Sequence, residues 1–207
     1  NNNAFGFYSL LNNTIGTSNN SFGSSALRFN TIGTNNNAFG YRALIFNTTG
    51  ADNIAIGTDA LYANTIGASN IAIGKNALAS GGESMAYGDD AQATQTSAAS
   101  FGQYAEATAT YAIAFGRTSA ASGDGAVAFG QQTSAAQAGA VAMGRQVTAD
   151  TADTTHVRAL KIVAPDGAAL GGNGITMLSP DGTAGEITLT NDSKLAIDGT
   201  AIGGDVF

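Results

Sequence analysis

Large apolar residues, small residues and glycines recur in one short pattern along most of the chain. A large apolar residue stands before each repeating glycine, and Ala or Ser stands before that apolar residue. The glycines are spaced by 17 residues at positions 6, 23, 40, 57 and 74, and then by 14 residues at 88, 102, 116, 130 and 144. Alternation of large and small side chains has the period of a β-strand. The pattern therefore predicts ten short strands that end at Phe5, Phe22, Phe39, Ile56, Ile73, Tyr87, Phe101, Phe115, Phe129 and Met143.

Each of these predicted strands is too short to be stable alone. A fixed repeat favours stacking of equivalent strands, one in each coil, as in a β-solenoid. Because both faces of each strand carry apolar or small residues, we expect both faces to be buried.

The 17-residue repeat has a second half with its own pattern. A leucine follows each glycine by four residues, at Leu10, Leu27, Leu44, Leu61 and Leu78, and always has Ser or Ala before it. The sequence Asn-Thr-x-Gly then recurs at 13–16, 30–33, 47–50 and 64–67. We expect a second strand at each leucine, and a corner at each Asn-Thr-x-Gly where Asn and Gly take positive φ.

The change of period marks a boundary. Ser80-Gly81-Gly82 replaces the fifth Asn-Thr-x-Gly corner, and the 14-residue spacing starts directly afterwards. We therefore predict an Asn-rich β-roll of 17-residue repeats over 1–82, a β-roll of 14-residue repeats over 83–150, and a small C-terminal β-domain over 151–207. A 14-residue coil encloses too little volume to offset chain entropy. Partner chains are therefore expected, and a homotrimer around a common axis is the natural solution.

The C-terminal segment carries ordinary strand and turn signals. Strands are expected at 157–163 and 175–178, each followed by Pro-Asp-Gly, at 165–167 and 180–182. A β-hairpin is expected from 186–190 to 194–197. Such a domain could cap the open end of the roll or form a tip that binds a receptor, and both interpretations remain open.

Composition and charge exclude several classes of function. The net charge is −7 and no segment forms a basic patch, so we expect neither nucleic acid nor anionic membrane as a partner. No apolar stretch of membrane-spanning length occurs, so no membrane insertion is expected. The chain has no cysteine and a single histidine, His156, which argues against a Ser/His/Asp site or a zinc site within one chain. We interpret His156 as part of a structural neck, although three copies around an axis could bind a metal or an anion.

The other residues that could indicate a catalytic, glycosylation or ice-binding site have simpler explanations. Asp166, Asp181, Asp192 and Asp198 could include the paired carboxylates of a glycosidase, but most of them lie in turn signals. Asn12, Asn19, Asn47 and Asn191 fit the glycosylation sequon, which chance explains in an Asn- and Thr-rich chain. The aligned Thr14, Thr31, Thr48 and Thr65 suggest an ice-binding face, but one Thr per coil does not make a flat array. No catalytic, cofactor or metal residue is assigned, and the ligand-binding residues are left open.

The sequences Ala-Ile-Ala-Phe-Gly (112–116), Ala-Val-Ala-Phe-Gly (126–130) and Ala-Val-Ala-Met-Gly (140–144) resemble the head repeats of YadA-like trimeric autotransporter adhesins. This resemblance implies left-handed parallel β-rolls with three chains side by side. Residues 1–82 look like Asn-rich repeats of such adhesins and of phage tail fibres. Residues 151–207 look like the β-domains at the ends of phage tail fibres.

Pattern and resemblance together predict a homotrimeric fibre or adhesin that presents its tip to a cell-surface glycan or protein. It is expected outside the cell, at the cell surface or in a virion tail fibre, without cofactor and without enzymatic activity. A fibre-borne glycan-degrading enzyme and a spacer without ligand are the alternatives. Because the sequence starts within a repeat, we expect it to be a piece of a longer protein.

Overall fold

The computed structural model describes residues 1–158, 175–178, 184–189, 195–197 and 200–201, and within them it contains strands and turns but no helix. The chain forms two compact units, Asn1–Ala159 and Leu160–Phe207. The predicted all-β fold is therefore confirmed.

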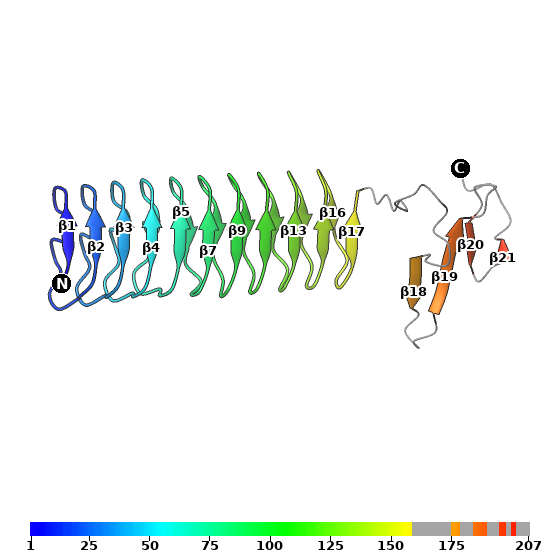
Figure 1. Ribbon diagram of the computed structural model, residues 1–207, viewed down its shortest axis with the longest axis horizontal. Helices are drawn as coiled ribbons and strands as arrows, with labels where there is room; N and C mark the ends of the chain where they lie inside the picture. The colour runs from blue at the N-terminus through cyan, green and yellow to red at the C-terminus, as the bar shows by residue number, and fades with distance from the viewer. Residues whose placement is uncertain (159–174, 179–183, 190–194, 198–199, 202–207) are drawn as a thin grey trace, which may run out of the picture. The chain divides into compact units, whose positions relative to one another are not determined.

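The first unit is a parallel β-solenoid whose coils each add one strand to a long sheet (Figure 1). Equivalent repeat positions pair, so that Phe5 lies opposite Phe22 and Ile73 lies opposite Tyr87 across the change of period. The eleven strands, in their order in the sheet, are β1 (Asn3–Phe5), β2 (Asn20–Phe22), β3 (Asn37–Phe39), β4 (Ile54–Ile56), β5 (Ile71–Ile73), β7 (Met85–Tyr87), β9 (Ala99–Phe101), β11 (Ile113–Phe115), β13 (Val127–Phe129), β15 (Val141–Met143) and β17 (Thr155–Val157).

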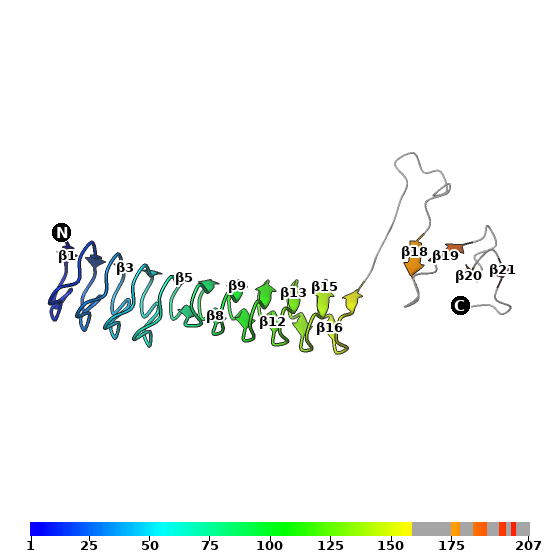
Figure 2. The ribbon, with the colours of Figure 1, turned by 90° about the horizontal axis from the view of Figure 1, so that it is seen from below.

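A short parallel sheet of six strands forms the other side of the later coils (Figure 2). Its strands are β6 (Leu78–Ala79), β8 (Gln92–Ala93), β10 (Glu106–Ala107), β12 (Ala120–Ala121), β14 (Ser134–Ala135) and β16 (Thr148–Ala149). We call the 17-residue coils before β6 the wide coils and the 14-residue coils from β6 onward the narrow coils. The two kinds of coil share the long sheet, and only the narrow coils have the short one.

The second strand predicted at the leucines is wrong for the wide coils. Leu10, Leu27, Leu44 and Leu61 lie in turns and have φ values between 48° and 52°, in the left-handed region. The longer coil uses its extra residues in this turn, which points Leu27, Leu44 and Leu61 into the interior, where they are fully buried. Leu78, in the first narrow coil, is in a strand as predicted.

The expected positive φ at Asn-Thr-x-Gly is also wrong. The left-handed residues at this corner come two positions after its glycine, at Ser18, Asn35, Asp52 and Ser69. The glycine is needed for space instead: a Cβ on Gly33 would meet the carbonyl oxygen of Gly50 and the side chain of Asn30. The glycine that ends each strand does have positive φ, between 120° and 144°.

The interior of the solenoid is lined by the small residue in the middle of each strand. Ala38, Ala55 and Ala72 in the wide coils, and Ala114, Ala128 and Ala142 in the narrow coils, are fully buried. In the narrow coils the short sheet adds more alanines, among them Ala93 and Ala107. The narrow core therefore consists mainly of methyl groups.

Two asparagine ladders complete the interior of the wide coils. In the first ladder (Asn19, Asn36, Asn53 and Asn70), Asn36 Oδ1 accepts from the Asn53 backbone N–H at 3.1 Å, and Asn36 Nδ2 donates to the Gly50 carbonyl at 2.8 Å. In the second ladder (Asn13, Asn30, Asn47 and Asn64), each amide donates to the asparagine of the preceding coil, for example from Asn47 Nδ2 to Asn30 Oδ1 at 2.8 Å. Since buried polar backbone groups need partners, these side chains hold the corners of neighbouring coils together.

The solenoid continues for one coil beyond the ten that the glycine pattern predicts. In β17, His156 pairs with Ala142 and Val157 pairs with Met143. The sequence hides this coil because His156 replaces the buried Ala and Arg158 replaces the glycine. The strand predicted at 157–163 thus begins at the end of β17, and from residue 159 onward it lies outside the described residues.

The second unit contains a small antiparallel sheet in the order β18 (Ile175–Leu178), β19 (Ala184–Leu189), β20 (Leu195–Ile197) and β21 (Thr200–Ala201). Both Pro-Asp-Gly turns predicted for this unit, at 165–167 and 180–182, lie outside the described residues.

Candidate binding surfaces

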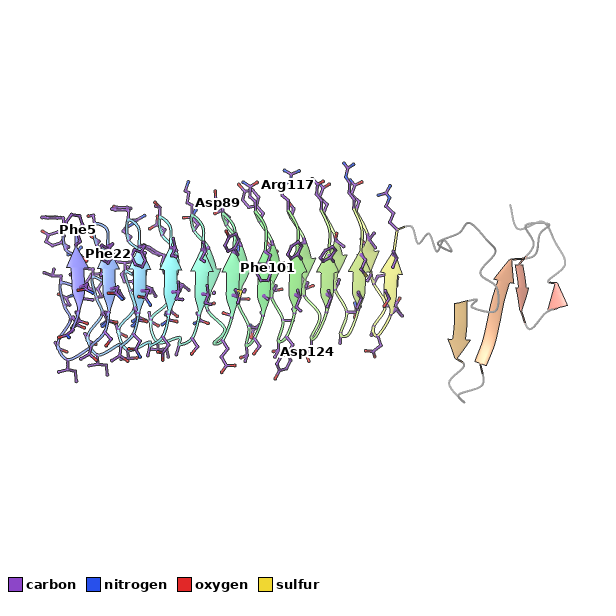
Figure 3. The ribbon with its side chains drawn as sticks, viewed as in Figure 1. Phe5, Phe22, Asp89, Phe101, Arg117 and Asp124 are labelled. Atoms are coloured by element: carbon purple, nitrogen blue, oxygen red, sulfur yellow. The ribbon has the colours of Figure 1, made fainter. Side chains whose placement is uncertain are left out.

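The large residue that ends each strand of the long sheet points away from the interior. Phe115 and Phe129 are 47% and 49% exposed, and their rings stack at 5.0 Å. Phe22 and Phe39 stack at 5.1 Å in the same way in the wide coils. Phe22 and Phe101 mark this face in Figure 3. The prediction that both strand faces are buried is therefore wrong for the chain by itself, because only the alanine face is covered.

A second outward row runs beside the first, two residues earlier in each strand. It begins with asparagines, which form a hydrogen-bonded chain from Asn3 to Asn20 at 2.7 Å and from Asn20 to Asn37 at 2.8 Å. From β4 to β15 it is apolar, with Ile54, Ile71, Met85, Ala99, Ile113, Val127 and Val141. We call the two rows together the apolar face of the long sheet.

The wide coils carry a second notable surface on the side that the short sheet occupies in the narrow coils. The Arg28 guanidinium lies 4.7 Å from the ring centre of Tyr8, and Arg42 lies 4.8 Å from Tyr41 and 5.1 Å from Tyr62. Such contacts between a cation and an aromatic ring are attractive. We call this group, which also includes Phe29 and Phe46, the aromatic cluster.

The aromatic cluster contains an ion pair that sequence reasoning missed. Arg42 Nη2 donates to Asp59 Oδ2 at 2.8 Å, and Arg42 Nε lies 2.7 Å from Asp59 Oδ1. The hydrogen bond to Asp59 raises the pKa of the Arg42 guanidinium above its ordinary value. A signal was present in the sequence, because two residues 17 apart occupy the same position in neighbouring wide coils.

A pocket of about 320 Å³ lies beside this ion pair, where the wide coils meet the first narrow coil. The last wide coil contributes Asp59, Tyr62 and Ala63, and the previous one contributes Arg42. The first narrow coil contributes Asn76, Ala77 and Leu78. The pocket therefore lies at the step between the two kinds of coil, and sequence reasoning did not find it.

His156 lies in the last strand of the long sheet, where it is partly buried. Its Nε2 is 3.0 Å from Thr154 Oγ1 in the same chain. Within the residues that the structure describes, no group of three or more His, Cys, Asp or Glu is arranged to hold a metal ion. Asp166, Asp181, Asp192 and Asp198 lie outside those residues.

The aligned threonines and two of the four sequon asparagines have structural partners. The hydroxyls of Thr14, Thr31 and Thr48 each donate to a carbonyl of the next coil, at 2.9–3.0 Å. Asn19 and Asn47 are fully buried, whereas Asn12 is exposed, and Asn191 is outside the described part of the chain. No helix of the described residues is long and apolar enough to cross a membrane.

Comparison with known proteins gives one family match, and it lies almost entirely in the narrow coils. The YadA head domain repeat (two copies) matches residues 71–91, 93–119 and 121–146. No curated protein matches the chain. Among solved structures, the collagen-binding domain of the Yersinia adhesin YadA aligns over 72% of this chain and 74% of that one, with 18% identity and a TM-score of 0.45. The segment from residue 71 to residue 146 is therefore similar in sequence to YadA head repeats.

Proposed function

We propose that three copies of this chain pack through the apolar faces of their long sheets to form a segment of a surface adhesin. The observation that carries this proposal is the continuous row of exposed large residues on that face, one in each coil. Monomeric soluble proteins rarely expose contiguous apolar patches of this kind, and such patches mark interaction sites.

The narrow coils explain why the association is needed for stability. Their interior holds mainly alanine methyl groups, so a single chain buries little apolar surface. Burial contributes roughly 25 cal/mol per Å² of apolar area, and the largest apolar side chains of these coils point outward. Packing Phe115, Phe129 and Ile113 against neighbouring copies would add the missing burial. The number three follows from the resemblance to trimeric adhesins.

The adhesive role rests on the YadA head repeats. Under this proposal the first compact unit, Asn1–Ala159, forms the fibre, and the second, Leu160–Phe207, serves as a cap or tip. The target is a glycan or protein of a cell surface, and the fibre itself lies outside the cell, on a cell surface or on a virion. Its role is binding, without chemistry.

Sedimentation equilibrium of the purified chain tests the assembly. We expect a trimer, and we expect Phe115→Asp to dissociate or unfold it, because the substitution buries a charge in a stacked row. Tyr111→Asp is the matched control, because Tyr111 is 62% exposed and lies in a corner outside the apolar face. A stably folded monomer at all concentrations would contradict the assembly.

Binding of the chain to an array of glycans and matrix proteins tests the adhesive role. The same array with residues 1–159, the first compact unit, asks whether the C-terminal segment carries the binding site. Loss of binding with the truncation would support a tip, and unchanged binding would place the site on the solenoid. Absence of binding by either form would favour a spacer.

A further inference from the structure

The pocket at the step between the wide and narrow coils follows from the change of period. In the wide coils the residues after each strand form a turn, which carries Tyr62 and Ala63 in its last copy. The next coil is three residues shorter and replaces this turn with the strand β6. The turn of the last wide coil therefore has no equivalent in the next coil, and its exposed side borders the pocket.

The lining combines one aromatic ring with three hydrogen-bonding side chains. Tyr62 supplies the ring, and Arg42, Asp59 and Asn76 supply the polar groups. Ala63, Ala77 and Leu78 supply the apolar remainder. The volume of about 320 Å³ is at the lower end of the range for small-ligand sites, which suits one or two rings.

The polar and aromatic groups are held in place before any ligand arrives. The two oxygens of Asp59 face Arg42 at 2.7 Å and 2.8 Å, so both side chains are fixed. The Arg42 guanidinium stacks on the Tyr62 ring at 5.1 Å, and Phe46 meets the same ring edge-on at 5.0 Å. Asn76 Nδ2 donates to Asp90 Oδ1 at 2.9 Å. Preorganisation of this kind lowers the entropic cost of binding.

We propose that this pocket binds a neutral pyranose ring of a glycan. The C–H face of a pyranose packs on an aromatic ring, and its hydroxyl groups both donate and accept hydrogen bonds. The pocket offers a ring together with a donor (Arg42), an acceptor (Asp59) and an amide (Asn76). The proposal deepens the adhesin role and rests on it for the biological target, although the site lies within one chain.

The charges around the pocket favour a neutral sugar over an acidic one. The charge of Arg42 is compensated by Asp59 in the same lining. Asp90 contacts Asn76, and Asp89 accepts a hydrogen bond from the backbone N–H of Lys75 at 3.0 Å. These acidic groups would repel a carboxylate or sulfate on the ligand, and the lining has no unpaired cation to offset the repulsion.

The site also suits the proposed assembly. It lies on the side of the coils away from the apolar face of the long sheet, so packing through that face leaves it open. Three copies would then present three equivalent pockets, and weak single sites gain strength through avidity.

Saturation-transfer NMR with the full chain tests the proposal. The probes are methyl α-D-glucopyranoside, methyl β-D-galactopyranoside and methyl β-N-acetylglucosaminide, with methyl β-D-glucuronide as the acidic comparison. We expect at least one neutral probe to bind. Tyr62→Ala should weaken it roughly tenfold or more, the scale for loss of a central aromatic contact, and Asn76→Ala should weaken it as well. Tyr104→Ala, an exposed tyrosine of the narrow coils, should leave binding unchanged.

Three outcomes would overturn the proposal: no neutral probe binds, only the glucuronide binds, or both the Tyr62 and the Asn76 variants bind like the unmodified chain. Circular dichroism and sedimentation of each variant show whether it is folded and assembled, and the partly exposed positions 62 and 76 give two independent tests. A trimer that binds an array target but no pyranoside would contradict the pocket alone. A monomer that binds the pyranoside would contradict the assembly alone.

Discussion

The wide and narrow coils form one continuous long sheet, yet they fill their interiors by different means. The wide coils enclose leucines and two asparagine ladders, whereas the narrow coils enclose mainly alanines. On the long-sheet side the strands pair in the same register through the change of period. The strand with its following glycine therefore sets the stacking, while the opposite side of the coil can vary in length and chemistry.

The difference also separates two ways of stabilising a thin solenoid. A wide coil stabilises itself with apolar volume and with side-chain hydrogen bonds to its neighbours. A narrow coil has less apolar volume and no asparagine ladder, and it depends more on what covers its outward face. The following four predictions test this contrast by urea unfolding, followed by circular dichroism at a fixed chain concentration because an assembling chain has concentration-dependent stability.

The largest effect is expected from Leu44→Ala in a wide coil. Leu44 is fully buried in the interior, so its removal leaves a cavity and lowers the free energy of unfolding by about 2–5 kcal/mol. Leu11→Ala is the control, because Leu11 is 53% exposed and should cost much less. Equal losses for the two variants would show that the leucines do not form a core.

A somewhat smaller loss, of roughly 2–3 kcal/mol, is expected from Asn36→Ala. The substitution leaves the buried backbone N–H of Asn53 without its acceptor and removes one of the acceptors of Asn53 Nδ2. Asn12→Ala, at an exposed asparagine, should change the free energy of unfolding little. If Asn36→Ala is as mild as its control, the asparagine ladder does not stabilise the wide coils.

The reverse change, Ala114→Leu, tests the narrow interior. Ala114 is fully buried between Ser100 and Ala128 of the neighbouring strands, so a larger side chain should cost about 1–3 kcal/mol by overpacking. Ala120→Leu is the matched control in the short sheet, because Ala120 is only partly buried. A stabilised Ala114→Leu variant would mean that the narrow core has unfilled space.

The smallest effect is expected at the junction, from Asn70→Ala. Asn70 Oδ1 accepts from the Ser84 backbone N–H at 3.1 Å and from the Ser84 hydroxyl at 2.9 Å, but its Nδ2 is buried without a partner among the described residues. The narrow coil does not supply the corner carbonyl that the wide coils provide. Removing this unsatisfied donor offsets part of the two lost hydrogen bonds, so the net loss should be about 1 kcal/mol, smaller than that of Asn36→Ala. A loss as large as that of Asn36→Ala would contradict this account of the junction.

Much of the fold could be predicted because the same pattern of strand and glycine recurs along most of the sequence. The strands of the long sheet and the change of period at Ser80-Gly81-Gly82 follow from spacing alone. The eleventh coil could not be found in this way, since His156 and Arg158 replace the two residues that mark a coil. The leucine turns were missed because left-handed φ at Leu44 and its equivalents runs against the preference of that residue type.

The candidate sites, too, could be predicted only in part from the sequence. The outward row of large residues was visible in the sequence, but its exposure was not, because alternation does not tell which face is inside. The pocket depends on residues from three coils, and the pairing of Arg42 with Asp59 appears only when the coils are written in register.

The repeat, the parallel stacking and the place where the coils change length can all be derived from spacing, because spacing sets which residues meet their equivalents in the next coil. The buried strand face, the turns of the wide coils and the position of the pocket became visible only in the folded chain. These features depend on how much volume a coil encloses and on whether the next coil has an equivalent turn. Neither can be derived from a single repeat.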